Sequence, residues 1–279
     1  MEAKALLKEQ QYLSGYSVED YERPSLTTDI AVFSLQTETD VQYRNDPVQE
    51  ISVLLIRRGE HPFKNCWALP GGFLKKGETL EDCAFRELKE ETGLEPAQML
   101  WIGSYSQPGR DPRGWIISHG YAGISTEEDA ALVASTDAVE AGWFRVTLEK
   151  QKDGTHLLQL RQGETEMTVK LQAERCRLGG SRFRVLESTE LAFDHGAVIG
   201  EAMEMLKKRA EDIQTVFSFL PEKFTLSALQ KVQETLMGIS HLTPNFRRKI
   251  AAFVEETDEY TEGAGHRPAR LYKRKEATP

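Results

Sequence analysis

Cysteine is scarce in this chain, and long hydrophobic runs are missing. Its 279 residues contain three cysteines, Cys66, Cys83 and Cys176, an odd number without the paired spacing of a zinc site. This pattern argues against a disulfide-stabilised scaffold and predicts thiols in a reducing compartment. No apolar run approaches the roughly 20 residues that cross a bilayer, and residues 1–16 have no apolar signal core. We therefore expect a cytoplasmic protein that does not contact membranes.

An excess of positive charge is also missing. The formal net charge is -9, which argues against nucleic-acid binding by the whole surface but leaves room for a local basic patch. With 279 residues the chain is longer than a typical single domain. Length alone therefore predicts one domain joined to a smaller one.

Three glutamates near position 90 form the most informative pattern. Glu87 precedes Glu90 and Glu91 by three and four residues, so a helix would place all three carboxylates on one face. Like charges at this spacing destabilise a helix unless a cation compensates them. Magnesium suits this role, because it prefers carboxylate oxygens and often joins one or two of them to substrate phosphates. The alternative is the solvated acidic face of an ordinary amphipathic helix.

The residues around this helix define its ends. Thr79, with Asp82 three positions later, is typical of a capping box at the start. Gly93 suits the left-handed residue just after the end. Before the helix, Gly71 and Gly72 lie in a loop where the backbone can approach a metal ion or a phosphate closely. Together these residues predict a strand–loop–helix unit.

The stretch resembles the signature of the Nudix hydrolases, Gly-x5-Glu-x7-Arg-Glu-apolar-x-Glu-Glu-x-Gly-apolar. The resemblance implies an α/β fold, the Nudix α/β/α sandwich with a mixed sheet. It also implies a hydrolase that uses Mg2+ or Mn2+ to cleave a nucleoside diphosphate linked to another group. Every fixed position of the signature is filled, by Gly72, Glu78, Arg86, Glu87, Glu90, Glu91, Gly93 and Leu94.

The resemblance further implies a role for each matched residue. The glutamates would bind the metal ion, the glycine loop would add a backbone ligand, and an ion pair would orient the helix. The general base stays open between a signature glutamate and the acidic residues 127–129. The residues are Glu87, Glu90, Glu91 and Gly71 for the metal, Arg86 and Glu78 for orientation, and Gly71, Gly72 and Arg57 for the substrate.

Segments rich in branched apolar residues and bounded by polar turns predict the strands of this domain. An added stretch, residues 150–190, predicts two or three further antiparallel strands. This insertion could extend the sheet, contribute to a dimer interface or overhang the active site. The other predicted strands are residues 29–35, 51–56, 99–105 and 115–122, with a closing strand in 137–146.

The loop 107–114 narrows the expected substrate. In Nudix enzymes that act on ADP-ribose, a proline stands a short way beyond the signature, and Pro108 is near that place. Arg110 and Arg113 flank a proline-stiffened turn and would clamp a pyrophosphate, because guanidinium groups match phosphate oxygens bidentately. A surface turn with solvated arginines is an equally weighted alternative.

A helix is expected over residues 196–212, where apolar residues recur at helical spacing. Asp194 and His195 stand just before it. They could be an acid–base pair, but capping of the helix by Asp194 is the favoured interpretation.

From about residue 217 the pattern is typical of a winged helix. Thr225 is expected to cap a helix that ends at Gly238, and Thr243 and Pro244 begin a second helix. Phe253 is expected to face inward, and a basic strand follows a glycine turn near the end of the chain. Helix, turn, helix and basic hairpin form the plan of a winged-helix domain.

The two parts together resemble the Nudix-related transcriptional regulators of NAD metabolism. The matching stretches of the second part are residues 224–226, 245–249 and 267–272. The resemblance implies a homodimer in which a Nudix domain senses an ADP-ribose-like nucleotide and a winged helix binds operator DNA. Those regulators often have an eroded metal signature, whereas this one is complete. The implied DNA-binding residues are Arg247, Arg248, Lys249, Arg267 and Arg270.

The expected architecture is a helical extension (1–24), a Nudix domain (25–212) with the insertion at 150–190, and a winged-helix domain (213–279). The leading functional prediction is a metal-dependent hydrolase that cleaves the pyrophosphate of ADP-ribose or a related nucleoside diphosphate derivative. The alternative is a DNA-binding transcriptional regulator whose Nudix domain senses such a nucleotide. A third reading is a hydrolase whose C-terminal domain only builds a dimer.

Overall fold

The main sheet of the protein is mixed, as the sequence predicts. A computed structural model describes residues 2–37, 49–126, 138–176, 182–261 and 268–275. The strand order is β4-β5-β1-β2-β6-β7-β8-β9, with β3 beside β2. β1 runs parallel to β5, and the other neighbours are antiparallel. The strands are β1 (Ser25–Thr37), β2 (Gln49–Arg58), β3 (Trp67–Ala68), β4 (Gln98–Tyr105), β5 (Ile116–Ile124), β6 (Ala138–Lys150), β7 (His156–Gln162), β8 (Thr165–Glu174) and β9 (Arg182–Ser188).

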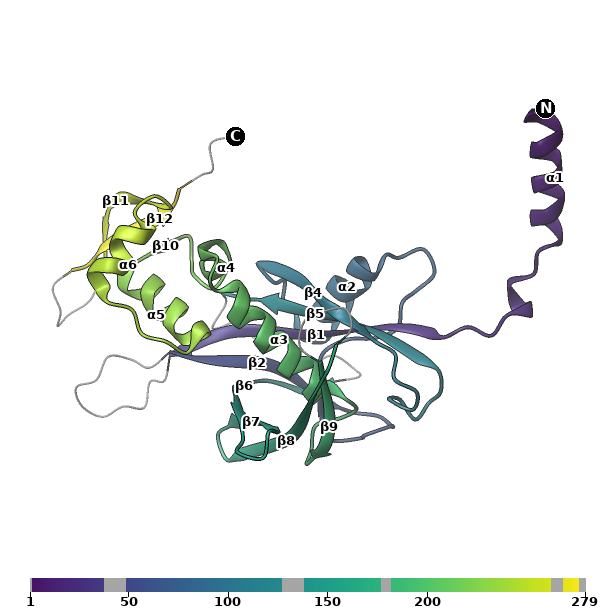
Figure 1. The fold of residues 1–279 in the computed structure, drawn as a ribbon, viewed down its shortest axis with the longest axis horizontal. Coiled ribbons are helices and arrows are strands. Elements are labelled where there is room, and N and C mark those ends of the chain that lie inside the picture. The colour runs from purple at the N-terminus through teal and green to yellow at the C-terminus, as the bar shows by residue number, and fades with distance from the viewer. Residues whose placement is uncertain (1, 38–48, 127–137, 177–181, 262–267, 276–279) are drawn as a thin grey trace.

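Strand β1 shows why the sheet has a helix on each side. Successive side chains of a strand point to opposite faces. Ile30 and Val32 pack with α2 (Leu80–Thr92), whereas Ala31 and Phe33 belong to the core that contains α3 (His195–Arg209). Both faces are therefore apolar and covered, and the result is the expected α/β/α sandwich (Figure 1).

The ends of α2 are set by local sequence, as predicted. The side chain of Thr79 accepts a hydrogen bond from the Asp82 backbone, and the Asp82 carboxylate accepts one from the Thr79 backbone. After the last turn, Gly93 has φ 75°, a left-handed conformation in which glycine meets little steric hindrance. The helix therefore begins and ends at fixed points beside the signature loop.

The insertion extends the sheet with three strands, β7, β8 and β9. Of the three roles left open by the sequence, the described residues show this one. α3 packs closely against it, because a Cβ at Gly196 would lie 2.7 Å from Val169, and one at Gly200 would lie 3.0 Å from Leu171. The insertion therefore serves as part of the surface on which α3 rests.

The C-terminal part has the predicted winged-helix order. Thr225 caps α5 through the backbone N–H of Ala228, and Gly238 ends that helix at φ 66°. The second helix, α6, ends earlier than expected, so Phe253 lies beyond it and is 40 % exposed rather than inward. The elements are α4 (Ile213–Phe217), β10 (Lys223–Phe224), α5 (Leu226–Met237), α6 (Thr243–Ile250), β11 (Val254–Tyr260) and β12 (Arg270–Arg274), with the sheet order β10-β12-β11.

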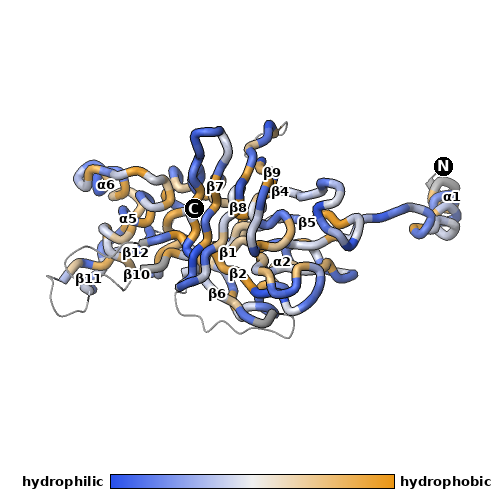
Figure 2. The backbone as a smooth tube through the Cα atoms, turned by 90° about the horizontal axis from the view of Figure 1, so that it is seen from below, coloured by the Kyte–Doolittle hydropathy of each residue, from blue (hydrophilic) through white to orange (hydrophobic). Residues whose placement is uncertain are grey.

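The winged helix does not have a core of its own. Leu229, Leu236 and Ile250 belong to the same buried cluster as Phe33 and Leu206. Figure 2 shows this continuity as hydrophobic segments that run from the central strands towards α5. A contiguous core makes the two parts resist independent motion.

The N-terminal helix α1 (Glu2–Gly15) has a different character. It stands away from the body of the protein in Figure 1, and Leu6, Leu7 and Leu13 on it are each about 60 % exposed. A 3-10 turn, Val18–Asp20, connects it to β1. None of the helices in the described ranges is long and apolar enough to cross a membrane.

Candidate functional site

A cavity of about 460 Å³ lies where β1, β2, the signature loop, α2, the 107–114 loop and the start of α3 meet. Such a volume is typical of small-molecule sites. Glu87, Glu90 and Glu91 all line it, as do Gly71 and Gly72. The signature residues that the sequence singled out are therefore brought together around one space.

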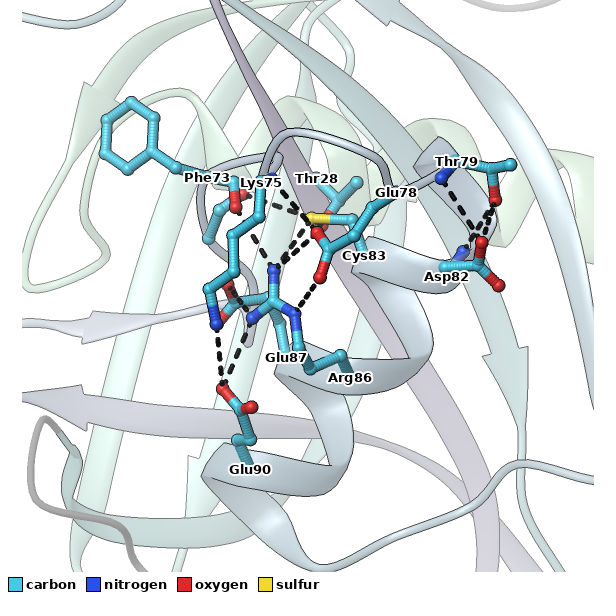
Figure 3. Close-up of polar contacts among 11 residues, drawn as sticks. Thr28, Phe73, Lys75, Glu78, Thr79, Asp82, Cys83, Arg86, Glu87 and Glu90 are labelled. Carbon is cyan, nitrogen blue, oxygen red and sulfur yellow. Dashed lines mark hydrogen bonds and ion pairs between the residues drawn. The ribbon is translucent and has the colours of Figure 1, made fainter.

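Arg86 holds the glutamates of α2 in place. Figure 3 shows its guanidinium between three carboxylates. Its Nε donates to Glu78 Oε1 at 2.5 Å, and its Nη1 donates to Glu87 Oε1 at 2.5 Å and to Glu90 Oε2 at 3.2 Å. The hydrogen bonds from Arg86 lower the pKa of Glu78 to about 2. This arrangement is the orienting ion pair that the sequence predicted for Arg86 and Glu78.

The two glycines allow the signature loop to lie directly against its neighbours. The Gly71 N–H donates to Glu91 Oε2 at 2.8 Å. A Cβ at Gly71, where φ is 152°, would lie 1.9 Å from the Thr28 carbonyl oxygen, and one at Gly72 would lie 2.4 Å from the Glu87 carboxyl carbon. A larger residue at either position would push the loop away from the carboxylates.

The donor set of this wall suits a hard divalent cation. Carboxylate oxygens of Glu87, Glu90 and Glu91 face the cavity beside the Gly71–Gly72 backbone. Within the described part of the chain, no three His, Cys, Asp or Glu groups converge closely enough to bind a metal without other ligands. The residues therefore fit an ion held by one or two carboxylates together with water and phosphate oxygens, which is the usual mode of Mg2+.

The opposite wall of the cavity is cationic and aromatic. The Arg58 guanidinium lies 5.0 Å from the centre of the Phe193 ring, and that of Arg113 lies 5.0 Å from Phe73 and 5.5 Å from Phe193. Burial and the nearby charge of Arg113 both lower the pKa of Arg58. Phe193 has φ 53°, a conformation that costs energy for a residue with a side chain. Two neighbouring guanidinium groups facing one cavity form a setting suited to an anion.

Arg57 is a correction to the predicted substrate contacts. Its Nε donates to the Asn65 carbonyl at 3.1 Å, and it forms an ion pair of 3.6 Å with Glu140. The cavity is lined by Ile56 and Arg58 instead, because alternate residues of β2 point the same way. The period of two along this strand was the signal in the sequence that could have identified Arg58.

Arg110 lines the cavity, but its guanidinium is already bonded to two carboxylates, and its contact with a pyrophosphate stays a prediction. Its side chain is 5 % exposed and pairs with Asp194 at 2.6 Å and with Asp29 at 3.1 Å. Arg113 lines the same cavity but also pairs with Asp111 at 2.7 Å. The two arginines of the loop therefore differ: one belongs to a buried ionic network, and the other is partly exposed.

Asp194 and His195 form neither of the arrangements proposed for them. Asp194 is the residue just before α3, at the N-cap position, but it makes no side-chain capping bond. Its carboxylate instead accepts two bonds from Arg110. His195 Nδ1 accepts the Leu69 N–H at 2.8 Å, and its Nε2 lies 3.5 Å from Asp29 Oδ1. Both residues therefore bond to residues far away in the sequence and not to their neighbours.

Asp29 is the buried centre of this network. Burial alone would raise its pKa, but the hydrogen bond from His195 and the charge of Arg110 outweigh that effect. The pKa of Asp29 is held well below its usual range. Ser118 adds a hydrogen bond of 2.6 Å. The wall of the cavity behind the signature loop is therefore charged, paired and buried.

The second candidate site is the exposed face of α6. Arg247, Arg248 and Lys249 are exposed in its last turn. Arg248 donates to Asn245 at 3.0 Å, and in the ranges that the structure describes neither Arg247 nor Lys249 has an ion-pair partner. These side chains are available to phosphate groups.

The cations of the wing are less available to phosphate groups than those of α6. Arg270 is bonded to Tyr260 at 2.9 Å and is ion-paired with Glu256. Lys273 pairs with Glu255 at 2.6 Å. Arg267 lies outside the described residues, as do the acidic candidates for the general base, Glu127, Glu128 and Asp129.

Comparison with known families matches both sites. Residues 39–160 match the NUDIX domain, and residues 216–273 match the NrtR DNA-binding winged helix domain. The Nudix match contains the signature and the 107–114 loop. The winged-helix match contains α5, α6 and the wing.

Similar proteins span the whole chain or its Nudix part. An ADPR responsive transcriptional repressor of Acinetobacter baylyi is 31 % identical over 95 % of this chain and 88 % of its own length. An ADP-ribose pyrophosphatase of Methanocaldococcus jannaschii is 50 % identical over 92 residues, which are 33 % of this chain and 53 % of that enzyme. The crystal structure of Shewanella oneidensis NrtR with a 27mer DNA aligns over 90 % of this chain and 93 % of that one, with a TM-score of 0.61 and 26 % identity. The chain therefore belongs to the NrtR family, in which a Nudix domain is joined to a DNA-binding winged helix.

Proposed function

We propose that the protein is a DNA-binding transcriptional regulator whose cavity binds ADP-ribose or a related nucleotide. The observation that carries the proposal is the likeness to a responsive repressor over 95 % of the chain, across both sites. This proposal reverses the order of the two predictions made from the sequence, because the signature alone describes only the Nudix part.

The DNA side of the proposal rests on α6. In helix-turn-helix proteins the second helix enters the major groove, and α6 is the second helix of this unit. Its exposed Arg247, Arg248 and Lys249 offer three cations for phosphate contacts. Phosphate neutralisation supplies most of the non-specific affinity for DNA and makes binding depend on salt.

The ligand side rests on the two walls of the cavity. A diphosphate carries negative charge that the Arg58 and Arg113 guanidinium groups would bind, while the carboxylates of α2 would hold a divalent ion on its other side. The exposed ring of Phe73 and the ring of Phe193 offer apolar surfaces for a nucleoside. A dinucleotide-like diphosphate such as ADP-ribose combines these features in one molecule.

The test is DNA binding by the full chain with and without nucleotide. A duplex selected by the protein from a random library would serve as the probe in fluorescence anisotropy. We expect binding that weakens with salt, is abolished by Arg247→Glu with Arg248→Glu, and is shifted by ADP-ribose. An unchanged binding curve in the double variant would refute the role of α6.

A homodimer is part of the same proposal. Regulators with helix-turn-helix domains commonly bind two half-sites about one helical turn apart, and this requires two copies of the domain. Light scattering of the purified chain would show a mass near twice 31.6 kDa if the proposal holds. A monomer at all concentrations, with DNA bound, would contradict it.

Hydrolysis of ADP-ribose is the second candidate function, and the complete signature favours it. All three glutamates line the cavity, and the local likeness to the pyrophosphatase reaches 50 %. Hydrolysis would consume the ligand that the regulator senses, so the two functions are compatible.

In that reaction, Glu87, Glu90 and Glu91 would hold Mg2+ or Mn2+. The bound ion would neutralise phosphate charge and lower the pKa of a coordinated water. Arg86 keeps the carboxylates oriented, and Arg58 and Arg113 would hold the diphosphate. A water attacks phosphorus, the P–O–P bridge breaks, a carboxylate accepts the proton of the water, and AMP and ribose 5-phosphate leave.

The assay is release of the two phosphate monoesters from ADP-ribose, detected after phosphatase treatment. We expect Glu91→Gln to lower metal-dependent turnover by about 100-fold, because the amide removes one negative charge from the groups that would hold the ion. Lys89→Gln, on the same helix but paired with Glu95 in solvent, is the matched control. Intact turnover in Glu91→Gln would remove this candidate and leave sensing.

A further inference from the structure

Helix α3 touches the cavity at one end and the winged helix at the other. At the cavity end, its first residue, His195, lines the cavity. Its C-terminal cap, Ala210, is fully buried in the core shared with α5. With 15 residues the helix spans about 22 Å, at 1.5 Å per residue. Figure 1 shows it lying across the sheet, with α5 beside it.

The cavity end of α3 is held by long-range bonds instead of by a cap. Both carboxylate oxygens of Asp194 accept hydrogen bonds from Arg110, at 2.9 and 2.6 Å. His195 accepts the backbone N–H of Leu69, two residues before the glycine loop. The next residue back, Phe193, is held at φ 53° with its ring against Arg58. A ligand that draws Arg58, Arg113 or the signature loop towards itself therefore acts directly on the start of α3.

The far end of α3 is bonded to the winged helix by one side chain. Gln233 of α5 donates from Nε2 to the Ala210 carbonyl at 2.7 Å, and Gln233 is only 1 % exposed. A buried carbonyl needs a donor, and water cannot reach this one. The bond fixes the direction of α5, which in turn carries α6.

Close packing along the first half of α3 makes the helix rigid, so a movement at its cavity end is passed on along the helix. Gly196 and Gly200 lie against Val169, Leu171 and Phe183 with no spare room. On the same helix, the buried carboxylate of Glu201 accepts bonds from Tyr105, Arg182 and the Phe183 N–H. Close-packed elements of this kind move as units.

We propose that α3 couples the cavity to the DNA-binding helix, with Asp194 and Gln233 as the positioning residues at its two ends. Occupancy of the cavity changes the bonds at Asp194, His195 and Phe193, α3 shifts as a unit, and Gln233 transfers the shift to α5 and α6. This inference rests on the proposed sensing function. It adds the route by which a ligand changes the affinity for DNA.

The test measures coupling, which is the ratio of the DNA dissociation constants with and without ligand. The ligand is the α,β-methylene analogue of ADP-ribose with Mg2+, whose P–C–P bridge cannot be hydrolysed. The DNA is the duplex selected from a random library by the full chain. Allosteric ratios are typically about 5 to 150, and a general loss of stability would not change this ratio.

Gln233→Leu removes the donor but keeps the bulk of the side chain. We expect its coupling ratio to fall to within about threefold of unity, below the usual allosteric range. Gln230→Leu is the matched control, because Gln230 lies on the same helix but bonds to Glu234 and the His241 carbonyl, both inside the winged helix. The control should keep the wild-type ratio.

Asp194→Ser tests the other end and guards against misfolding of the first variant. Serine would cap α3 itself and thereby preserve the helix, while the bond to Arg110 is lost. We again expect a reduced ratio. A wild-type ratio in both Gln233→Leu and Asp194→Ser would overturn the route through α3, whereas the absence of any ligand effect in the wild-type protein would overturn sensing itself.

Discussion

The cavity and helix α6 use positive charge in opposite ways. In the cavity wall Arg110 is held by two carboxylates, and beside the cavity Arg86 is held by three. On α6, Arg247 and Lys249 reach into solvent, with no ion-pair partner among the residues that the structure describes. The paired arginines fix the positions of the carboxylates around them, whereas the exposed cations of α6 can bind another molecule.

The difference corresponds to what each site would bind. A small diphosphate is recognised by the fixed geometry of groups that surround it. DNA is a long array of phosphates, which exposed cations bind with little geometric demand but with strong dependence on salt. Paired, buried arginines therefore indicate selectivity for a small ligand, whereas unpaired arginines indicate affinity for a polyanion.

The largest effect should come from breaking the locked network at Asp29. Removal of one member of a buried charged network leaves its partners unpaired, and we expect Asp29→Asn to lower the free energy of unfolding at neutral pH by about 3 kcal/mol or more. Because the pKa of Asp29 is lowered in the folded state, its contribution is present above the ordinary value of 3.8 and is lost as the pH falls below it.

Urea unfolding of the wild type and of Asp29→Asn at several pH values would measure this effect. The two unfolding free energies should differ most at neutral pH and converge in acid. Asp153→Asn is the control, because Asp153 is an exposed carboxylate that bonds to Thr155 and Lys170. Equal losses for both substitutions would show that the cavity network has no special weight.

The second prediction compares α6 with the wing. Neutralising two exposed cations by Arg247→Gln with Arg248→Gln should weaken DNA binding by about 100-fold, and should lower the slope of log affinity against log salt by about 2. Neutralising two paired cations by Arg270→Gln with Lys273→Gln should cost less than about fivefold, because their charge is already compensated. Anisotropy titrations at several salt concentrations would decide. A larger loss from the wing pair would reverse the comparison.

The third prediction separates two neighbours on β2. Arg58→Lys keeps the charge but loses the planar fork that binds phosphate oxygens, and we expect the affinity for ADP-ribose to fall about tenfold, the size of one hydrogen bond to a charged group. Arg57→Lys, one residue away and outside the cavity, should have no effect. Calorimetry of both variants would test whether Arg58 is the residue that contacts the ligand.

The smallest expected effect concerns the caps of α2, which carries the glutamates, and of α5, which precedes the DNA-binding helix α6. Thr79→Ala in α2 and Thr225→Ala in α5 should each lower the free energy of unfolding by about 1 kcal/mol. The loss at Thr79 should be the larger, because its hydroxyl both accepts the Asp82 N–H and donates to the Asp82 carboxylate, whereas that of Thr225 accepts one bond. Denaturant titrations would show whether the order holds.

The features predicted correctly from the sequence are those encoded over a few residues. The capping box at Thr79, the glycine ends at Gly93 and Gly238, and the carboxylates on one face of α2 depend only on neighbours in the chain. Their physical causes, which are capping bonds, left-handed glycines and helical periodicity, are readable without the fold. The winged-helix order is visible for the same reason.

The features that the sequence did not show are bonds between distant residues. Asp194 is 84 positions from Arg110, and His195 is 126 positions from Leu69. The neighbouring sequence offers Asp194 a cap or a pair with His195, and it favours the cap because capping is the usual bond of an aspartate at that position. The sequence predicts the strand at 51–56 but not which face of it lines the cavity. Side chains alternate along a strand, so Arg58 lies on the same face as Ile56, and Arg57 lies on the other.

The acidic strand of the wing has a consequence of another kind. β11 lies at the edge of the small sheet, and a free edge offers unpaired backbone groups to the strands of other molecules. Glu255, Glu256, Asp258 and Glu259 along β11 would have to lose their water for such a contact to form. The charges that leave the wing a poor partner for DNA should therefore also protect the protein from strand-to-strand aggregation when it is concentrated.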